Sequence, residues 1–188
     1  MKVTPQSIPD VLLVEPSRFG DARGFFSEVW KRSALAAQGL DVRFVQDNHS
    51  LSRGVGVLRG LHFQRAPYAQ GKLVRVLRGR IFDIAVDLRE GSPTYLQTVA
   101  AELSAENWQQ LWIPRGFAHG FLTLEPETEV FYKVDAEYHR EADGGIAWDD
   151  PALGIDWPLP PGGPILSDKD RAAPRLAEVA PIFPRGTL

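Results

Sequence analysis

Proline and glycine interrupt this chain so often that few long helices fit between them. The 188 residues include 15 prolines and 17 glycines, spread from end to end. Proline fixes φ and lacks an N–H, and glycine favours turns, so both tend to end regular structure. Turn signals such as Arg78-Gly79 and Glu125-Pro126 recur between short apolar runs. The chain is therefore expected to form many short strands.

The clearest expected strand covers residues 81–88. Its even-numbered residues are all apolar, whereas Asp83 and Asp87 lie on the opposite face. An acidic row inside a strand faces either solvent or a polar cavity. The two carboxylates are as well placed to pair with Arg75 or Arg80 across the sheet as to act in a site.

Similar runs predict further short strands. They cover residues 11–14, 24–30, 43–47, 57–63, 72–77, 94–103, 110–113, 120–124 and 129–134. Short strands at this spacing are typical of an all-β sandwich or barrel.

Only two segments favour helix. Residues 33–39 offer Ser33 as an N-cap and Gly39 as a stop, and residues 104–107 could begin one helical turn. Residues 151–164 hold five prolines and predict an ordered coil. We expect a single domain over residues 1–188, with a barrel over about 11–148 and a coil-rich C-terminal arm over about 149–188.

Composition limits the partners and the compartment. Residues 18–89 hold 13 basic and 6 acidic residues, although the whole chain has a net charge of −3. From the counts alone, this basic part is best explained as solvated surface charge. If it binds a ligand, phosphate on a small molecule is favoured, because a nucleic-acid partner would usually require a larger basic excess. No apolar run reaches the ~18 residues of a membrane span, and no signal peptide precedes Glu15, so we expect a cytoplasmic protein without a membrane partner. The absence of cysteine excludes disulfides and thiolate sites.

Two histidine-containing segments resemble the signature blocks of the cupin superfamily. The first is His62-Phe63-Gln64, and the second runs from Pro114 to His119. Strict alternation would put Gly60, His62 and Gln64 on one face, opposite Arg59, Leu61 and Phe63, if no bulge intervenes. Metal-binding cupins generally carry His-x-His in the first block, followed by a carboxylate. Gln64 replaces that second histidine, and two remaining histidines make a weak metal site, so we expect no metal and no cofactor.

Eight blocks in order carry a more specific resemblance. They are Asp21–Glu28, Gln46–Ser50, Leu58–Gln64, Gln70–Arg75, Phe82–Arg89, Pro114–Phe121, Tyr132-Lys133 and Leu166–Asp170. Together they resemble the dTDP-4-dehydrorhamnose 3,5-epimerase family over about residues 8–174. That family implies a cupin-type double-stranded β-helix (jelly-roll barrel), without metal, forming a homodimer with shared active sites. It also implies a substrate, dTDP-4-dehydro-6-deoxy-D-glucose, and inversion at C3 and C5 in dTDP-L-rhamnose biosynthesis.

The resemblance also implies roles for individual residues. His62 matches the general base, Asp170 the carboxylate that orients it, Tyr132 the acid on the opposite face, and Lys72 the cation that stabilises the enolate. Asp168 is a competing candidate for the partner of His62, but Asp170 fits the pattern after Ser-x-Lys. The implied substrate-binding residues are Arg23, Glu28, Gln46, Asp47, Asn48, Arg59, His119, Tyr138, Asp143 and Lys169, several of them reaching the neighbouring subunit's site. Asp143 stands where the family often has Glu.

Other assignments remain open at this point. Without the resemblance, Tyr132 is more typical of a packing tyrosine, and the five tryptophans favour core or interface positions. We expect Asp83 on the His62 side of the barrel, and no catalytic role for His49 or His139. The same motifs also fit a relative that inverts only C3 or only C5. A third alternative is a non-catalytic or metal-dependent cupin.

Overall fold

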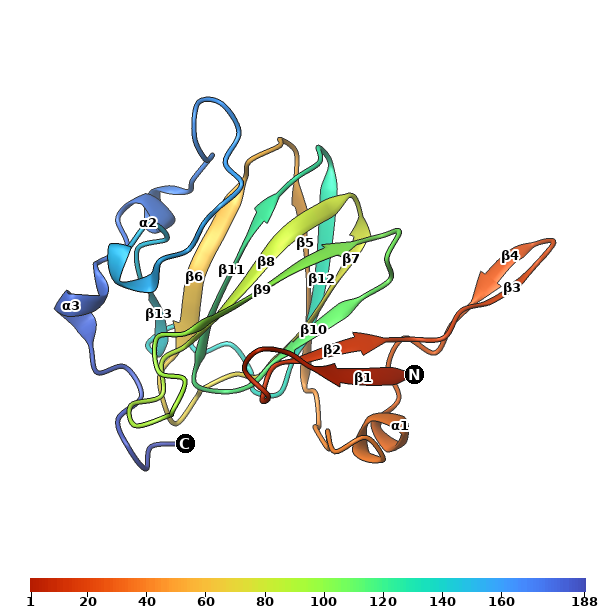
Figure 1. The fold of residues 1–188 in the computed structure, drawn as a ribbon, viewed down its shortest axis with the longest axis horizontal. Helices are drawn as coiled ribbons and strands as arrows, with labels where there is room; N and C mark the ends of the chain where they lie inside the picture. Colours follow the sequence, from red (N-terminus) through yellow and green to blue (C-terminus); the bar gives the residue numbers. More distant parts are fainter.

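Two antiparallel sheets form the body of the computed structural model, which describes residues 1–188 (Figure 1). The six-stranded sheet has the order β1 (Lys2–Pro5), β2 (Leu12–Glu15), β10 (Gln110–Ile113), β7 (Lys72–Arg78), β12 (Thr128–Val134) and β5 (Gln46–Ser52). The five-stranded sheet has the order β13 (Asp143–Gly145), β6 (Leu58–Gln64), β11 (Phe117–Thr123), β8 (Arg80–Asp87) and β9 (Thr98–Ser104). The expected all-β, cupin-type architecture is confirmed.

The space between the two sheets holds one apolar cluster. Val74, Leu111 and Val130 from the six-stranded sheet meet Ala85 and Phe121 from the five-stranded sheet there. Each strand contributes every second residue, because side chains alternate across a pleated sheet. Burial of this interior cluster holds the two sheets together.

Strand β8 has the alternation that its sequence predicts, and both of its faces are buried. Ala85 packs between the sheets, whereas Ile84 and Val86 pack on the outer side of the five-stranded sheet. Asp83 and Asp87 are completely buried on the inner side. Neither pairs with Arg75 or Arg80: Asp83 contacts His119, and Asp87 binds Arg89, Ser92 and Thr94. The predicted cross-sheet ion pairs are therefore wrong, because these positions face inward.

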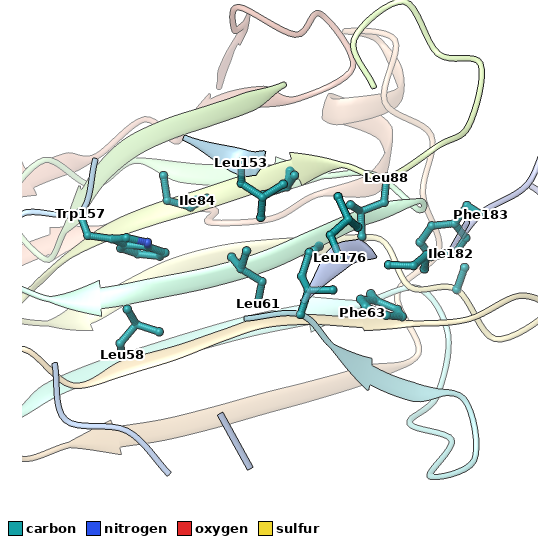
Figure 2. Close-up of a cluster of buried hydrophobic side chains, with 14 of the residues drawn as sticks. Leu58, Leu61, Phe63, Ile84, Leu88, Leu153, Trp157, Leu176, Ile182 and Phe183 are labelled. Carbon is teal, nitrogen blue, oxygen red and sulfur yellow. The ribbon is translucent and has the colours of Figure 1, made fainter. Parts of the chain in front are cut away.

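The C-terminal residues cover the outer face of the five-stranded sheet. They include the short helices η1 (Pro151–Leu153), α2 (Asp168–Arg171) and α3 (Leu176–Val179). Figure 2 shows Leu153, Leu176 and Phe183 from this segment gathered over Leu61 and its neighbours on β6 and β8. Burial of these side chains holds the segment against the sheet and brings α2 beside β6.

A small hairpin extends away from the barrel. It consists of β3 (Phe19–Asp21) and β4 (Gly24–Phe26), and Figure 1 shows it projecting clear of both sheets. Phe19, Phe25 and Phe26 are each more than half exposed on it. The predicted strand 24–30 is therefore too long, since regular pairing ends at Phe26.

Local predictions of helix were only partly correct. Helix α1 (Arg32–Ala36) begins after Lys31, which makes no side-chain cap, so the predicted Ser33 cap is wrong. Residues 104–107 form a turn, because Ser104 Oγ and the Asn107 side chain take up the free backbone N–H groups. None of the helices is long and apolar enough to cross a membrane.

The strand predictions also differ from the structure in places. Strands β1, β3 and β13 were not predicted, and β5 begins three residues later than the predicted 43–47.

Candidate active site

Two adjoining cavities are lined by strands of both sheets and by the C-terminal segment. The larger has a volume of about 420 Å³ and the smaller about 270 Å³. They share His62, Lys72, Tyr132 and Lys169 in their walls. These four residues come from β6, β7, β12 and α2, so both sheets and the C-terminal segment build the site.

His62 and Asp170 form the closest polar contact in the larger cavity. His62 Nε2 lies 2.5 Å from Asp170 Oδ1, and the Asp170 side chain is buried. Because a carboxylate accepts hydrogen bonds, this contact places the proton of a neutral imidazole on Nε2 and leaves Nδ1 free to accept another. The pair can therefore take up a proton at Nδ1 and stabilise the resulting imidazolium.

Ser167 fixes the orientation of Asp170. Its hydroxyl donates to Asp170 Oδ2 at 2.8 Å and also accepts from the Asp170 backbone N–H at 3.1 Å. Burial raises the pKa of Asp170, but the hydrogen bonds from His62, Ser167 and the Gly60 backbone outweigh burial and lower that pKa overall. Asp170 is thus held as an anion beside the imidazole.

A β-bulge at Gly60 determines which residues of β6 reach the cavity. His62 pairs with His119 of β11, but Arg59 pairs with Phe121, so two residues of β6 oppose one of β11. At Gly60, φ is +132°, and a Cβ atom would lie 2.6 Å from the Cα of Gly120. Arg59 and His62 both line the cavity as a result. The opposite faces were expected only in the absence of a bulge, and the bulge found here shifts the alternation by one residue.

Lys72 lies at the start of β7, and its ammonium makes no hydrogen bond or ion pair within the chain. The side chain is buried apart from its contact with the cavity. Burial lowers the pKa of Lys72 to about 8, although the negative charges of Asp83 and Asp143 oppose this shift. The residue is a cation with free donors, aimed at the space that a ligand would fill.

His119 of β11 and Asp83 of the neighbouring strand β8 form a second histidine–carboxylate pair. His119 is buried, and its Nε2 lies 2.7 Å from Asp83 Oδ1. Burial lowers the pKa of His119, against the attraction of Asp83. Asp83 Oδ2 is buried without a hydrogen-bond partner. The expectation that Asp83 lies on the His62 side is confirmed, since its partner His119 pairs directly with His62.

Tyr132 packs against the apolar cluster between the sheets and also lines both cavities. Burial raises the pKa of its hydroxyl, so the phenol stays protonated at neutral pH. The packing and functional interpretations of Tyr132 are therefore compatible.

The smaller cavity holds the candidates for binding a nucleotide. Gln46, Asn48, Tyr138, Asp143 and Lys169 all line it. Lys169 forms an ion pair with Asp143, and the Tyr138 hydroxyl donates to the same carboxylate oxygen at 3.2 Å. A polar, partly cationic cavity beside an exposed tyrosine ring suits an anionic aromatic ligand.

The model of the dTDP-4-dehydrorhamnose 3,5-epimerase family matches residues 5–178. The chain belongs to that family. Its members include a dTDP-4-dehydrorhamnose 3,5-epimerase of Pseudomonas aeruginosa, which is 54% identical over 98% of this chain and 100% of the relative. A protein of that name from Sinorhizobium fredii is 54% identical over 94% of this chain and 90% of the relative.

Solved structures of epimerases share the whole fold. An epimerase of Legionella pneumophila, solved in complex with dTDP-4-keto-L-rhamnose, superposes with a TM-score of 0.93 and 46% identity, covering 100% of this chain and 99% of the other. A 3′-monoepimerase of Streptomyces bikiniensis, solved with dTDP-quinovose, has a TM-score of 0.86 and 32% identity over 96% and 91% of the chains. The barrel is thus common to epimerases that differ in the carbons they invert.

Three candidate residues of this epimerase-family chain lie outside both cavities. Arg23 sits in the projecting hairpin and pairs with Asp21, while Glu28 pairs with Lys31. Asp47 lies on the outer face of β5 and binds Lys133, since it alternates with the inward-facing Gln46 and Asn48. The fold of one chain does not bring these three side chains to the site.

The other two histidines, His49 and His139, line neither of the two cavities. His49 is exposed and contacts Glu129, and the His139 ring stacks on Tyr68. No group of three or more histidine, aspartate or glutamate side chains is arranged to hold a metal ion. Of the tryptophans, Trp112 and Trp157 are buried.

Sequence reasoning missed two residues that shape the site. The resemblance assigns no role to Ser167, although a serine three residues before an aspartate is a recognisable helix-start pattern. At Gln64, the sequence indicates only the loss of a metal ligand. Its hydrogen bonds join segments far apart in the chain, so no local pattern indicates them.

Proposed function

We propose that this chain converts dTDP-4-dehydro-6-deoxy-D-glucose to dTDP-4-dehydro-L-rhamnose by inverting C3 and C5, a step of dTDP-L-rhamnose biosynthesis. The observation that carries the proposal is the set of groups around the larger cavity. A histidine–carboxylate base, a free buried cation and a protonated phenol line one space. Family membership supplies the substrate class, and its named members act as 3,5-epimerases.

The chemistry needs a base, an electrophile and an acid. The protons on C3 and C5 are acidic because both carbons flank the C4 ketone. His62 Nδ1 takes the proton from carbon, and the buried Asp170 stabilises the imidazolium. The Lys72 ammonium stabilises the negative charge that develops on the C4 oxygen, with no metal required. Tyr132 returns a proton to the opposite face, which inverts the carbon.

The nucleotide would occupy the smaller cavity. Tyr138 is 55% exposed and offers a ring on which thymine can stack. Lys169 lines both cavities, and Arg59 lines the adjoining larger one, so the two supply positive charge for a diphosphate that lies between the cavities. His119 also lines the larger cavity, where it can contact the sugar or the enolate. Gln46, Asn48 and Asp143 complete the polar wall.

We infer that the active unit is a homodimer. Arg23, Glu28 and Asp47 line neither of the two site cavities of their own chain, so their proposed substrate contacts require a second copy. The projecting hairpin supports this, because three phenylalanines exposed on one small hairpin need an apolar surface to cover them.

We place this enzyme in the cytoplasm, as expected from the sequence, and cell fractionation tests that location.

The decisive experiment is proton NMR of the substrate with this protein in D2O. Deuterium at both C3 and C5, with an L-sugar trapped by a coupled reductase, is the expected result. Deuterium at only one carbon would instead indicate a single-centre epimerase. No exchange at either carbon, with dTDP still bound, would leave a binding protein and contradict the proposal.

A further inference from the structure

Three glutamine side chains from different parts of the chain converge on the backbone of residues 136–139. Gln70 Nε2 donates to the Ala136 carbonyl at 2.7 Å, and Gln46 Oε1 accepts from the Tyr138 N–H at 2.9 Å. Gln64 Nε2 donates to the Glu137 carbonyl at 3.1 Å, and its Oε1 accepts from the His139 N–H at 2.5 Å. Each residue from 136 to 139 thus has one backbone group bound by a glutamine.

We call the side chains of Gln46, Gln64 and Gln70 the glutamine clamp, and Gln64 is its central member. Its side chain is buried, and Nε2 also donates to the Tyr68 carbonyl at 2.7 Å. Both N–H donors and the carbonyl oxygen of the amide are therefore used. These bonds join the loop that follows β6 to the loop that follows β12. The Tyr68 and His139 rings stack across the same junction, with centroids 3.8 Å apart.

The clamp holds the backbone around Tyr138 but makes no bond to its side chain. The backbone N–H of Tyr138 and a backbone group on each neighbour are held, whereas the side chain is 55% exposed beside the smaller cavity. A coil without these bonds would have unpaired backbone groups and many accessible conformations. Holding the coil before a ligand arrives removes that ordering cost from binding.

We propose that Gln64 is a positioning residue for the nucleotide, acting by fixing residues 137–139 so that the Tyr138 ring is held at the edge of the smaller cavity. The proposal rests on the proposed function, in which Tyr138 stacks on thymine. It assigns Gln64 to nucleotide affinity rather than to proton transfer, because its amide is fully occupied by backbone groups. Loss of Gln64 should therefore raise KM and leave kcat nearly unchanged.

The test compares Gln64→Met with Asn107→Leu in the full-length protein. Methionine is close to glutamine in size but makes none of its three hydrogen bonds. Asn107 is the control for the loss of hydrogen bonds, since its amide, although exposed, also makes three backbone hydrogen bonds, to residues 102, 104 and 109. We expect both variants to melt earlier, but only Gln64→Met to exchange amide hydrogens faster over residues 135–142. The Kd for dTDP and the KM should rise about tenfold in Gln64→Met alone, which corresponds to ~1.4 kcal/mol.

A double-mutant cycle separates positioning from general loosening. In a Tyr138→Ala background, Gln64→Met should have no further effect on dTDP affinity, because Gln64 acts through that ring. Full additivity of the two substitutions would overturn the proposal. If Gln64→Met does not fold, Gln64→Glu replaces it, since an oxygen then faces the carbonyls of Tyr68 and Glu137.

Further outcomes distinguish a failure of the clamp proposal from a failure of the proposed function. Unchanged exchange over residues 135–142, or unchanged dTDP affinity in a folded Gln64 variant, contradicts the clamp alone. A wild-type protein that binds no dTDP contradicts the proposed function and the nucleotide role of Gln64 together. Hydrogen exchange still decides in that case whether Gln64 orders the segment.

Discussion

His62 and His119 are direct partners across β6 and β11, and each binds a different buried aspartate. The two histidines nevertheless have different surroundings. The His62 side chain is 33% exposed to the cavity, whereas that of His119 is 7% exposed, and burial lowers the pKa of His119. A base must reach the substrate and accept a charge, so this difference favours His62 as the base.

Replacement of His62 by alanine should abolish epimerisation. Loss of a positioned general base typically costs about 10²–10⁴-fold in rate. The measurement is deuterium incorporation at C3 and C5, followed by NMR. His49→Ala is the matched control, because His49 also contacts a carboxylate but lies outside both cavities. Full turnover by His62→Ala would exclude the assignment.

Asp170→Asn should reduce kcat strongly, while Asp168→Asn in the same short helix should behave like wild type. Asp170 contacts His62 and is buried, whereas Asp168 is exposed. The lowered pKa of Asp170 also gives a stability test with a defined sign. Its contribution is present above the unfolded pKa of about 3.9 and is lost as pH falls through the folded value. Urea unfolding should therefore separate wild type from Asp170→Asn at pH 7, and the separation should shrink as the pH falls below about 3.9.

Lys72→Met should inactivate the protein and also stabilise it. At pH 7 the chain bears the cost of burying the ammonium, and a methionine of similar length removes that cost. Because the folded pKa of about 8 lies below the unfolded value, wild-type stability should rise with pH between about 8 and 10. Melting curves at pH 7 should show a higher Tm for the variant, and kcat should fall at least about 10²-fold. A lower Tm at pH 7 would argue against the buried cation.

Tyr132→Phe should separate proton removal from proton return. The ring keeps its packing between the sheets, so the stability change should stay below about 1.5 kcal/mol. Only the hydroxyl that lines the cavities is lost. We expect epimerisation at C5 to fall more than solvent exchange, measured as product formed against deuterium incorporated. An equal loss of both would place the hydroxyl in binding rather than in protonation.

Phe183→Ala should destabilise the protein by about 3–5 kcal/mol. Phe183 is 2% exposed and packs on Phe63 in the cluster of Figure 2. Denaturant unfolding measures the change, and Leu159→Ala, at an exposed position of the same segment, is the control.

Truncation before Leu166 is expected to remove activity, because it removes Asp170. Such a truncation also uncovers the outer face of the five-stranded sheet, so Asp170→Asn is the cleaner test.

Local pattern in the sequence was enough to predict most of the sheet. The bounds of β10 at residues 110–113 are as predicted, and β7 and β12 differ by one residue. The alternation over 81–88 is also correct, because a strand repeats every two residues whatever packs against it. The ordered blocks likewise identified the family and the pairing of His62 with Asp170, which lie 108 residues apart.

Only the tertiary structure decided which side chains meet. The bulge at Gly60 arises where β6 closely approaches Gly120, and it brings Arg59 to the same cavity as His62. Asp83 meets His119 rather than an arginine, because β8 is covered on both faces. Gln64 meets the backbone of residues 137–139 only after two distant loops have come together. Periodicity is a property of neighbouring residues, whereas bulges, buried pairs and clamps depend on the packing of segments that no local pattern relates.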